Sequence, residues 1–402
     1  MGNSTKDKLF TSSFIFACIG NFMLFMGCYL LLPILPLYMV DEFGSSGSEI
    51  GLILAGYMLT TLAIRPFSAY MADMFNRKPV YLTAYILFIL LFIGYPLAQS
   101  ILIFALFRAI HGLTFGMVST AGNTLIIDIM PSSRRGEGLG YFGVANNLAM
   151  ATGPMLGLMI HESTGSFDLI FFVAVLSGLL GFCFASRIKA PKKNKIVKEP
   201  LSLDRFFLAK GLKAGICLMM LAIPYGMLTS YLVMYAQELG LEGNSGLFFL
   251  LMAVGLIASR TFAGKLVDKG QITQVITYGI IISIIGFTLF STLAFYPESL
   301  HQFVHFAFFA TPVLLGVGYG MLFPAFNTLF VAMAPNNRRA TASSTYLTSW
   351  DIGIGGGLLL GGCLSGIKSF SFAFIIGTIF VYIAVILFVF VVAPHFEKNK
   401  LR

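Results

Sequence analysis

Long hydrophobic runs, separated by short polar segments, recur along the whole chain. Each run reaches the roughly 20 residues that a helix needs to cross a hydrocarbon core. The runs lie near 11–38, 48–72, 79–98, 101–126, 138–160, 168–187, 212–236, 246–267, 273–294, 303–330, 341–366 and 370–393. Lipid offers no water to backbone groups, and these twelve runs are too long and too uniformly apolar for barrel strands. The pattern therefore predicts an all-α membrane protein with twelve transmembrane helices.

The composition agrees with a bilayer as the solvent. Of the 402 residues, 57% are hydrophobic and 11% are charged, whereas soluble domains carry roughly 25% charged residues. The first run is too long for a signal peptide and lacks a small-residue cleavage site, so we expect it to persist as a helix. The five cysteines lie in apolar runs without metal-ligand spacing, and we expect neither a metal nor a cofactor.

The basic residues are distributed unevenly between the two sides of the predicted bundle. If both termini and every second loop face one side, 22 of the 26 Lys and Arg residues lie there, and only Lys368 lies on the other. Cytoplasmic loops carry such an excess, so both termini are predicted to be cytoplasmic, with the protein in the inner membrane of a bacterium. The net charge of +9 then reflects topology, and it gives no reason to expect a nucleic-acid partner.

Two sequence patterns of the first half recur in the second half. At a constant offset of 195 residues, Arg65, Phe67 and Asp73 correspond to Arg260, Phe262 and Asp268. The stretch 115–135 aligns with 319–339 at an offset of 204 residues and shares an Asn-Thr-Leu triplet and an Arg-Arg pair. Parallel repeats of this kind are typical of transporters whose halves rock about a site near the bilayer midplane. The chain is therefore predicted to form two pseudo-symmetric six-helix halves, 1–189 and 209–402, joined by a cytoplasmic linker at 190–208.

Three short motifs resemble signatures of the major facilitator superfamily. AYMADMFNRKP, at 69–79, is similar to the loop signature between the second and third spans, although Ala69 stands where Gly is usual. LFRAIHG, at 106–112, resembles the membrane-arginine signature of the fourth span. Gly153, Pro154 and Gly157 resemble the signature of the fifth span in proton-coupled exporters, which implies that they bend this helix. The resemblance covers essentially the whole chain and implies alternating access, in the drug:proton antiporter branch.

The charged loop that follows the second span, and its repeat, are predicted to control closure of the cytoplasmic side. The resemblance implies that Asp73 faces the N-terminus of the span near 341–366. A carboxylate there meets unpaired N–H groups and the positive end of the macrodipole, an interaction of roughly 0.3 to 2 kcal/mol. The residues assigned to gating are Asp73, Arg77, Lys78 and Arg65, with Asp268 and Arg260 in the repeat. The alternative is that these side chains only anchor the loops at the membrane surface.

Three ionisable residues inside the spans are candidates for proton coupling. Arg108 lies about seven residues inside its span, where a permanent cation costs at least roughly 2.5 kcal/mol and normally faces protein or a watery cavity. His111 shares its helix face and titrates near neutral pH. Asp351 falls near the middle of its span, where the repeat has the neutral Asn147, and a carboxyl group there can take up and release a proton. The alternatives are an Arg108 bonded to backbone carbonyls, a His111 that only packs, and a static ion pair of Asp351 with Arg108 or Arg260.

The resemblance also implies that the first, fourth, seventh and tenth spans line a central cavity. The polar and aromatic residues predicted to line it are Asn21, Tyr29, Tyr225, Tyr231, His305, Tyr319 and Asn327. Their neighbours are mostly Phe, Leu and Met, and such a wall suits amphipathic or aromatic molecules better than polyhydroxylated ones. The alternative for each of these residues is helix packing alone.

These features predict a monomeric secondary transporter that exports a small amphipathic molecule in exchange for protons. The alternatives are a proton symporter or facilitator that imports a sugar or an organic acid, and a lipid flippase. An enzyme is not expected, because Asp351, Arg108 and His111 are too few and too dispersed for a catalytic site. The glycine-rich stretch at 353–362 lies inside an apolar span, so we expect close helix packing there rather than nucleotide binding.

Overall fold

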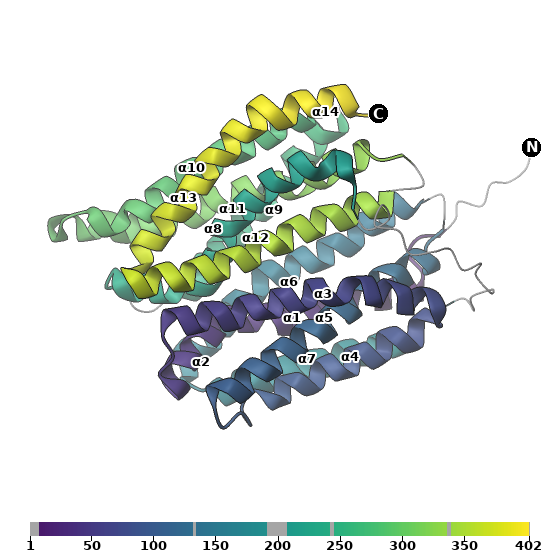
Figure 1. Ribbon diagram of the computed structural model, residues 1–402, viewed down its shortest axis with the longest axis horizontal. Coiled ribbons are helices and arrows are strands. Elements are labelled where there is room, and N and C mark those ends of the chain that lie inside the picture. The colour runs from purple at the N-terminus through teal and green to yellow at the C-terminus, as the bar shows by residue number, and fades with distance from the viewer. Residues whose placement is uncertain (1–7, 132–133, 191–206, 242–244, 336–338, 402) are drawn as a thin grey trace, which may run out of the picture. The chain divides into compact units, whose positions relative to one another are not determined.

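The computed structural model describes residues 8–131, 134–190, 207–241, 245–335 and 339–401. Within these ranges the secondary structure is helical, without a strand, as Figure 1 shows. The helices are α1 (Ser12–Leu31), α2 (Ile34–Phe43), α3 (Gly47–Met74), α4 (Arg77–Gly94), α5 (Ile101–Ile129), α6 (Arg135–Thr164), α7 (Phe167–Ser186), α8 (Leu212–Glu238), α9 (Ser245–Asp268), α10 (Ile272–Thr292), α11 (His301–Ala332), α12 (Arg339–Ile367), α13 (Phe370–Leu387) and α14 (Ala393–Asn399). The predicted all-α class is confirmed.

Each predicted span corresponds to a long helix. Eleven of the described helices are long and apolar enough to cross a membrane. α6, with 30 residues, is not among these eleven and occupies the predicted span near 138–160. The first predicted span is divided, because α1 ends at Leu31 and α2 begins only at Ile34. Pro33 lies in this break, where it has no N–H to continue the ladder of helical hydrogen bonds.

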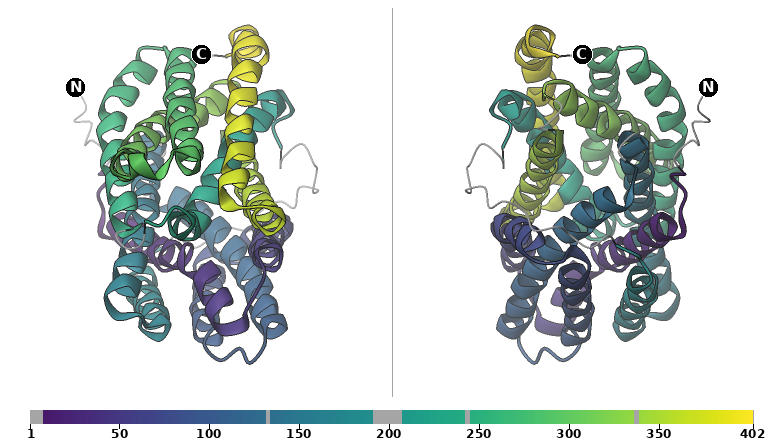
Figure 2. Two further views of the ribbon diagram at one scale, coloured as in Figure 1. Left: turned by 90° about the vertical axis from the view of Figure 1, so that its left-hand side faces the viewer. Right: turned by 90° about the vertical axis from the view of Figure 1, so that its right-hand side faces the viewer.

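The described residues form two compact units. One contains the described parts of 1–32 and 59–199, and the other contains those of 33–58 and 200–402. In the first unit α1 packs against α6 and α7, and α4 packs against α5. In the second unit α11 packs between α9 and α10, and α8 packs against α12 and α13 (Figure 2). Residues 191–206, most of the linker predicted at 190–208, lie outside the described residues.

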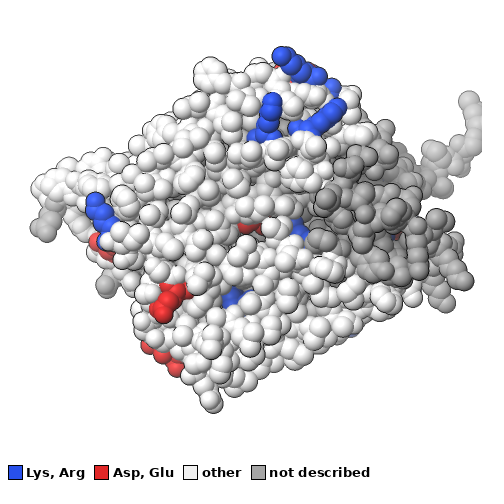
Figure 3. All heavy atoms as spheres, viewed as in Figure 1, with Lys and Arg blue, Asp and Glu red and all other residues white. Residues whose placement is uncertain are grey.

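The surface of the described helices is largely apolar. On the face seen in Figure 3, charged side chains are sparse and uncharged atoms cover most of the surface. Large hydrophobic side chains are exposed on several helices, including Leu102 on α5 at 78%, Phe306 on α11 at 71% and Phe262 on α9 at 70%. Apolar surface on this scale is stable only where lipid covers it, so the protein is an integral membrane protein.

Glycines let α8 and α12 approach each other closely. A Cβ atom added to Gly353 of α12 would lie 2.5 Å from the carbonyl oxygen of Met219 on α8, and one on Gly357 would collide with the carbonyl oxygen of Ile223. Farther along α12, a Cβ on Gly362 would collide with the backbone of Gly47 and Gly51 on α3. The glycine-rich stretch therefore serves close helix packing, as predicted.

We expect Gly357→Ala to destabilise the protein more than Gly356→Ala. The added methyl of Gly357→Ala meets backbone on α8, which cannot rotate away, so overpacking should cost about 1–3 kcal/mol. At Gly356 the nearest atom would be 3.7 Å away, an ordinary contact, and alanine is the better helix former there. Thermal unfolding of the two purified variants in one detergent measures the difference. Equal midpoints would contradict the assignment of Gly357 to the α8–α12 contact.

A carboxylate joins the end of α8 to the start of α13. Glu238 accepts hydrogen bonds from the backbone N–H groups of Phe370 at 2.7 Å and Ser371 at 3.1 Å. Ser369, the residue before α13, also accepts a hydrogen bond from the N–H of Phe372 through its hydroxyl. These acceptors satisfy N–H groups that have no partner within the helix. This connection holds the C-terminal end of α8 against the N-terminal end of α13.

Candidate functional site

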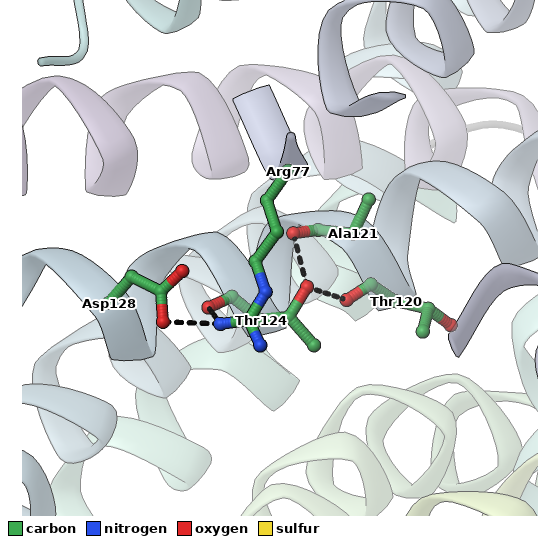
Figure 4. Close-up of polar contacts among 5 residues, drawn as sticks. All are labelled: Arg77, Thr120, Ala121, Thr124 and Asp128. Atoms are coloured by element: carbon green, nitrogen blue, oxygen red, sulfur yellow. Dashed lines mark hydrogen bonds and ion pairs between the residues drawn. The ribbon is translucent and has the colours of Figure 1, made fainter. Parts of the chain in front are cut away.

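The arginine at position 77 in the predicted gating loop forms an ion pair within the first unit. Arg77 begins α4, and its guanidinium pairs with the carboxylate of Asp128 near the end of α5 (Figure 4). The same Nη1 atom donates to the carbonyl oxygen of Thr124 at 3.2 Å. The Arg77 side chain is 17% exposed and that of Asp128 is 30% exposed, so the pair lies partly out of water. It ties the start of α4 to the end of α5.

Two of the other gating candidates lie among the described side chains. Lys78 is half-buried beside Arg77 at the start of α4, and Arg65 is half-buried in α3. The side chains of Asp73 and Asp268 lie outside the described part of the structure. The sequence prediction did not include Asp128. A carboxylate at the end of a span, just before the Arg134-Arg135 pair, is the signal that could have suggested it.

Arg108 and His111 meet a third residue in the interior of the first unit. Arg108 is 2% exposed and His111 is fully buried, both on α5. The hydroxyl of Tyr95, which follows the last residue of α4, accepts a hydrogen bond from Nη1 of Arg108 at 3.1 Å. The same hydroxyl lies 2.5 Å from Nδ1 of His111. The two ionisable side chains are thus linked through one phenol.

Arg108, Tyr95 and His111 form a hydrogen-bonded triad, which determines the ring nitrogen that carries the proton in a neutral His111. Arginine can only donate, so the Tyr95 oxygen acts as acceptor toward Arg108, and its hydrogen remains available to Nδ1 of His111. A neutral imidazole would then carry its proton on Nε2. The imidazole also packs against the rings of Phe88 and Phe92, with centroids 4.3 and 4.7 Å away. His111 is therefore held in a fixed orientation by one polar group and two apolar ones.

Tyr95 was not predicted from the sequence. It lies 13 residues before Arg108, just after the end of α4, and no sequence pattern distinguishes it from the other tyrosines among the 16 in the chain. Nη1 of Arg108 donates to this side-chain hydroxyl.

Four aromatic rings from three helices form a cluster in the second unit. Tyr225 of α8 lies 4.7 Å from Tyr319 of α11 and 5.1 Å from Trp350 of α12, measured between ring centroids. Phe323 of α11 packs edge-on against Trp350 at 4.7 Å. The Tyr319 hydroxyl donates to the carbonyl oxygen of Leu221 at 2.7 Å, which fixes its ring. This aromatic cluster of Tyr225, Tyr319, Phe323 and Trp350 lies near the middle of its helices.

Charged residues border the aromatic cluster. Tyr346, one turn before Trp350 on α12, lies within electrostatic range of both Arg260 on α9 and Asp351 on α12. Arg260 also lies within electrostatic range of Tyr225. Arg260, Tyr346 and Asp351 are each partly exposed, whereas Tyr225 and Tyr319 are buried. Two residues predicted for different roles, Arg260 for gating and Asp351 for proton coupling, are thus placed around one aromatic surface.

The other residues predicted to line the cavity are dispersed. Asn21 is buried in α1, and Tyr29 stacks on Phe25 with centroids 5.7 Å apart. Tyr231 is buried and donates to the carbonyl oxygen of Leu358 at 2.8 Å. His305 is exposed, at a shallow pocket of about 440 Å³, and Asn327 is exposed on α11. No group of three or more His, Cys, Asp or Glu side chains among the described residues could hold a metal ion.

The predicted helix-bending motif lies where α6 crosses α1. A Cβ on Gly153 would lie 2.7 Å from Cβ of Tyr29 and 2.9 Å from the backbone nitrogen of Leu30. Pro154 lies inside α6 without ending it, and Gly157 is buried. The absence of a side chain at Gly153 lets α6 contact the backbone of α1 close to the break at Pro33.

Comparison with known proteins bears on this arrangement. The sequence profile described as Major Facilitator Superfamily matches residues 17–353 and 277–402, which together span most of the chain. The chain belongs to the major facilitator superfamily. It is therefore a membrane transporter of this superfamily, whose members carry small molecules, and the predicted fold is confirmed.

Relatives and solved structures agree with this membership. The chain is 26% identical to the quinolone resistance protein NorA of Staphylococcus aureus (strain MRSA252), over 85% of this chain and 87% of the relative. It is 23% identical to a staphylopine export protein of Staphylococcus aureus, over 86% and 88%. The fold is similar to that of a D-xylose–proton symporter, with a TM-score of 0.75, 15% identity and coverage of 98% and 100%. A bacterial homologue of the lysosomal transporter Spinster, in an inward-facing and unoccupied conformation, gives a TM-score of 0.74 at 14% identity over 97% and 98%.

Proposed function

We propose that this transporter exports a small amphipathic molecule in exchange for protons. The observation that carries the proposal is the similarity over most of the chain to two proteins whose names state resistance or export. The aromatic cluster in the second unit supports an amphipathic or aromatic substrate, because aromatic walls with few polar groups favour such molecules. The protein then acts as a monomer in the bacterial plasma membrane, with both termini in the cytoplasm and its halves at 1–189 and 209–402.

Proton coupling is assigned to Asp351 and to the linked pair Arg108 and His111. Asp351 supplies the only acidic side chain of α12, and it borders the aromatic cluster through Tyr346. The imidazole of His111 is a candidate proton acceptor, and Tyr95 connects it to the fixed positive charge of Arg108. A proton bound at either place changes the charge inside one half, and this change can favour one of the two states of alternating access.

Gating is assigned to the loop that begins at Asp73 and to its repeat. The ion pair of Arg77 with Asp128 supports this role, because it makes the loop an extension of the rigid α4–α5 pair. A loop held in this way can present Asp73 to a helix N-terminus in one state and withdraw it in another.

Transport in inside-out membrane vesicles tests the proposal. Vesicles from cells that produce the protein are loaded with acidic buffer and diluted into alkaline buffer that contains a fluorescent quinolone. We expect the quinolone to accumulate in the vesicles, because outward-directed transport in the cell is inward in this orientation. A protonophore should abolish the accumulation, and vesicles without the protein provide the control. Accumulation that requires the reversed gradient would instead indicate symport, and its absence for every member of an amphipathic panel would refute export.

A further inference from the structure

Two hydrogen-bond donors beside the aromatic cluster have no acceptor in the part of the chain that is described. The Tyr225 side chain is 2% exposed, and its buried hydroxyl has no hydrogen-bond partner among the described residues. The buried Nε atom of Arg260 likewise has none there. Buried polar groups are nearly always hydrogen-bonded, so each exception calls for an explanation. Arg260 lies within electrostatic range of Tyr225.

Close helix contacts hold both donors at one level of the second unit. Ser259, which precedes Arg260 on α9, packs against Gly320 of α11, the residue after Tyr319. On the other side, Gly353 of α12 packs against Ala222 of α8, less than one turn before Tyr225. Because backbones meet at these glycines, the donors and the four rings are fixed by helix packing rather than by flexible loops.

The surrounding side chains define what kind of group could approach the donors. The rings of Tyr319, Phe323 and Trp350 pack around the Tyr225 ring and form an apolar surface there. Arg260 and Tyr346, which border the cluster, are partly exposed, whereas the four rings are buried. A guanidinium and a phenol are both strong donors toward a carboxylate, and arginine binds carboxylates by a planar fork of N–H groups.

We propose that Arg260 and Tyr225 bind the carboxylate of an aromatic substrate whose ring lies against Trp350 and Phe323. This inference rests on the proposed function and narrows its substrate class from amphipathic molecules in general to aromatic carboxylates. Arg260 compensates the negative charge in a low-dielectric setting, where a charge-assisted hydrogen bond is stronger than a neutral one. Tyr225 supplies the second donor, and the rings exclude water from the bound group. Asp351, which lies within electrostatic range of Tyr346, is assigned to proton coupling and not to holding the carboxylate.

The single tryptophan of the chain makes this site directly measurable. Trp350 is the only tryptophan among the 402 residues, and it belongs to the cluster. We would titrate the purified full-length protein in lipid nanodiscs at pH 7.5 with 4-nitrobenzoate, with its neutral isostere 4-nitrobenzamide and with the cation 4-nitrobenzylammonium. The nitro group quenches tryptophan on contact, and free N-acetyltryptophanamide corrects for absorption by the probes.

We expect 4-nitrobenzoate to bind at least about tenfold more tightly than the amide, because only the anion forms charge-assisted hydrogen bonds. Arg260→Gln should remove this preference without changing the affinity for the amide. Tyr225→Phe keeps the ring and should weaken only the anion. Lys265→Gln is the matched control, since it removes an exposed positive charge from the same helix, and it should leave both affinities unchanged. An unchanged emission maximum of Trp350 in each variant shows that the cluster remains packed.

Three results would overturn the inference: equal affinities of anion and amide in the wild type, tighter binding of the cation, or an anion preference that survives Arg260→Gln. Failure to detect binding of any probe also counts against an aromatic-carboxylate site. The vesicle experiment separates these failures from failure of the proposed function. Gradient-driven quinolone accumulation without an anion preference at Trp350 refutes this inference alone, whereas loss of accumulation refutes proton-coupled export.

Discussion

Asp351→Asn is expected to abolish uptake driven by a pH gradient while leaving exchange of substrate across the membrane. Asparagine has nearly the same shape as a protonated aspartate but cannot gain or lose a proton. If Asp351 carries the coupling proton, the variant can still bind substrate and change conformation, but the gradient no longer drives net transport. The physical basis is the position of Asp351 within the apolar helix α12, since an ionisable side chain inside a membrane span is costly and normally has a functional role.

Purified protein in proteoliposomes allows both activities to be measured. Net uptake is followed after a pH jump, and exchange is followed with labelled substrate at equal pH on both sides. Asp41→Asn is the matched control, because Asp41 is exposed near the end of α2, and it should leave both activities intact. We expect net uptake by Asp351→Asn to fall to the level of empty liposomes. Exchange should stay within about twofold of the wild type, because the substitution removes the proton site and leaves the contacts with substrate unchanged.

Gradient-driven uptake that survives in this variant would exclude Asp351 as the coupling site. Loss of both activities would instead indicate a structural role, such as the static ion pair considered above.

Tyr95→Phe is expected to destabilise the first unit and to slow proton-driven transport. The change removes only the hydroxyl that accepts from Arg108 and faces Nδ1 of His111. Removing one member of a buried hydrogen-bond network costs about 1–3 kcal/mol, because the remaining polar groups lose compensation for their burial. The guanidinium of Arg108 and the imidazole of His111 then also lose their fixed relative orientation.

Tyr81→Phe provides the control for this prediction. Tyr81 is a buried residue of α4, the helix that Tyr95 directly follows, and it is 4% exposed. No hydrogen bond of its hydroxyl is found among the described residues, so its loss should change stability little. Thermal unfolding and the pH dependence of vesicle uptake are measured for both variants. If Tyr95→Phe matched Tyr81→Phe in the unfolding midpoint and in the pH profile of transport, the triad would be neither a stabilising network nor part of the proton pathway.

The membrane fold could be predicted from the sequence because hydropathy is a local property. Each helix in lipid must satisfy its own backbone hydrogen bonds, so a run of roughly 20 apolar residues predicts its own structure without reference to the rest of the chain. The repeat of Arg65 and Asp73 as Arg260 and Asp268 likewise shows on inspection of the sequence. The role of the glycine-rich stretch 353–362 followed from its composition in the same way, and the contacts of Gly353 confirm it.

The partners of the charged residues depend on the tertiary structure. Arg108 and His111 share a helix face, so the sequence could pair them, but Tyr95 and Asp128 come from elements whose packing no local pattern reports. Arg260 was grouped with the gating residues through the repeat, whereas the packing of α8, α9, α11 and α12 brings it beside Tyr225 and the aromatic cluster. The sequence by itself determined where helices form, since that depends on each segment and its solvent. Only the tertiary structure decided which polar side chains meet, because such contacts depend on how helices distant in sequence are rotated and packed against one another.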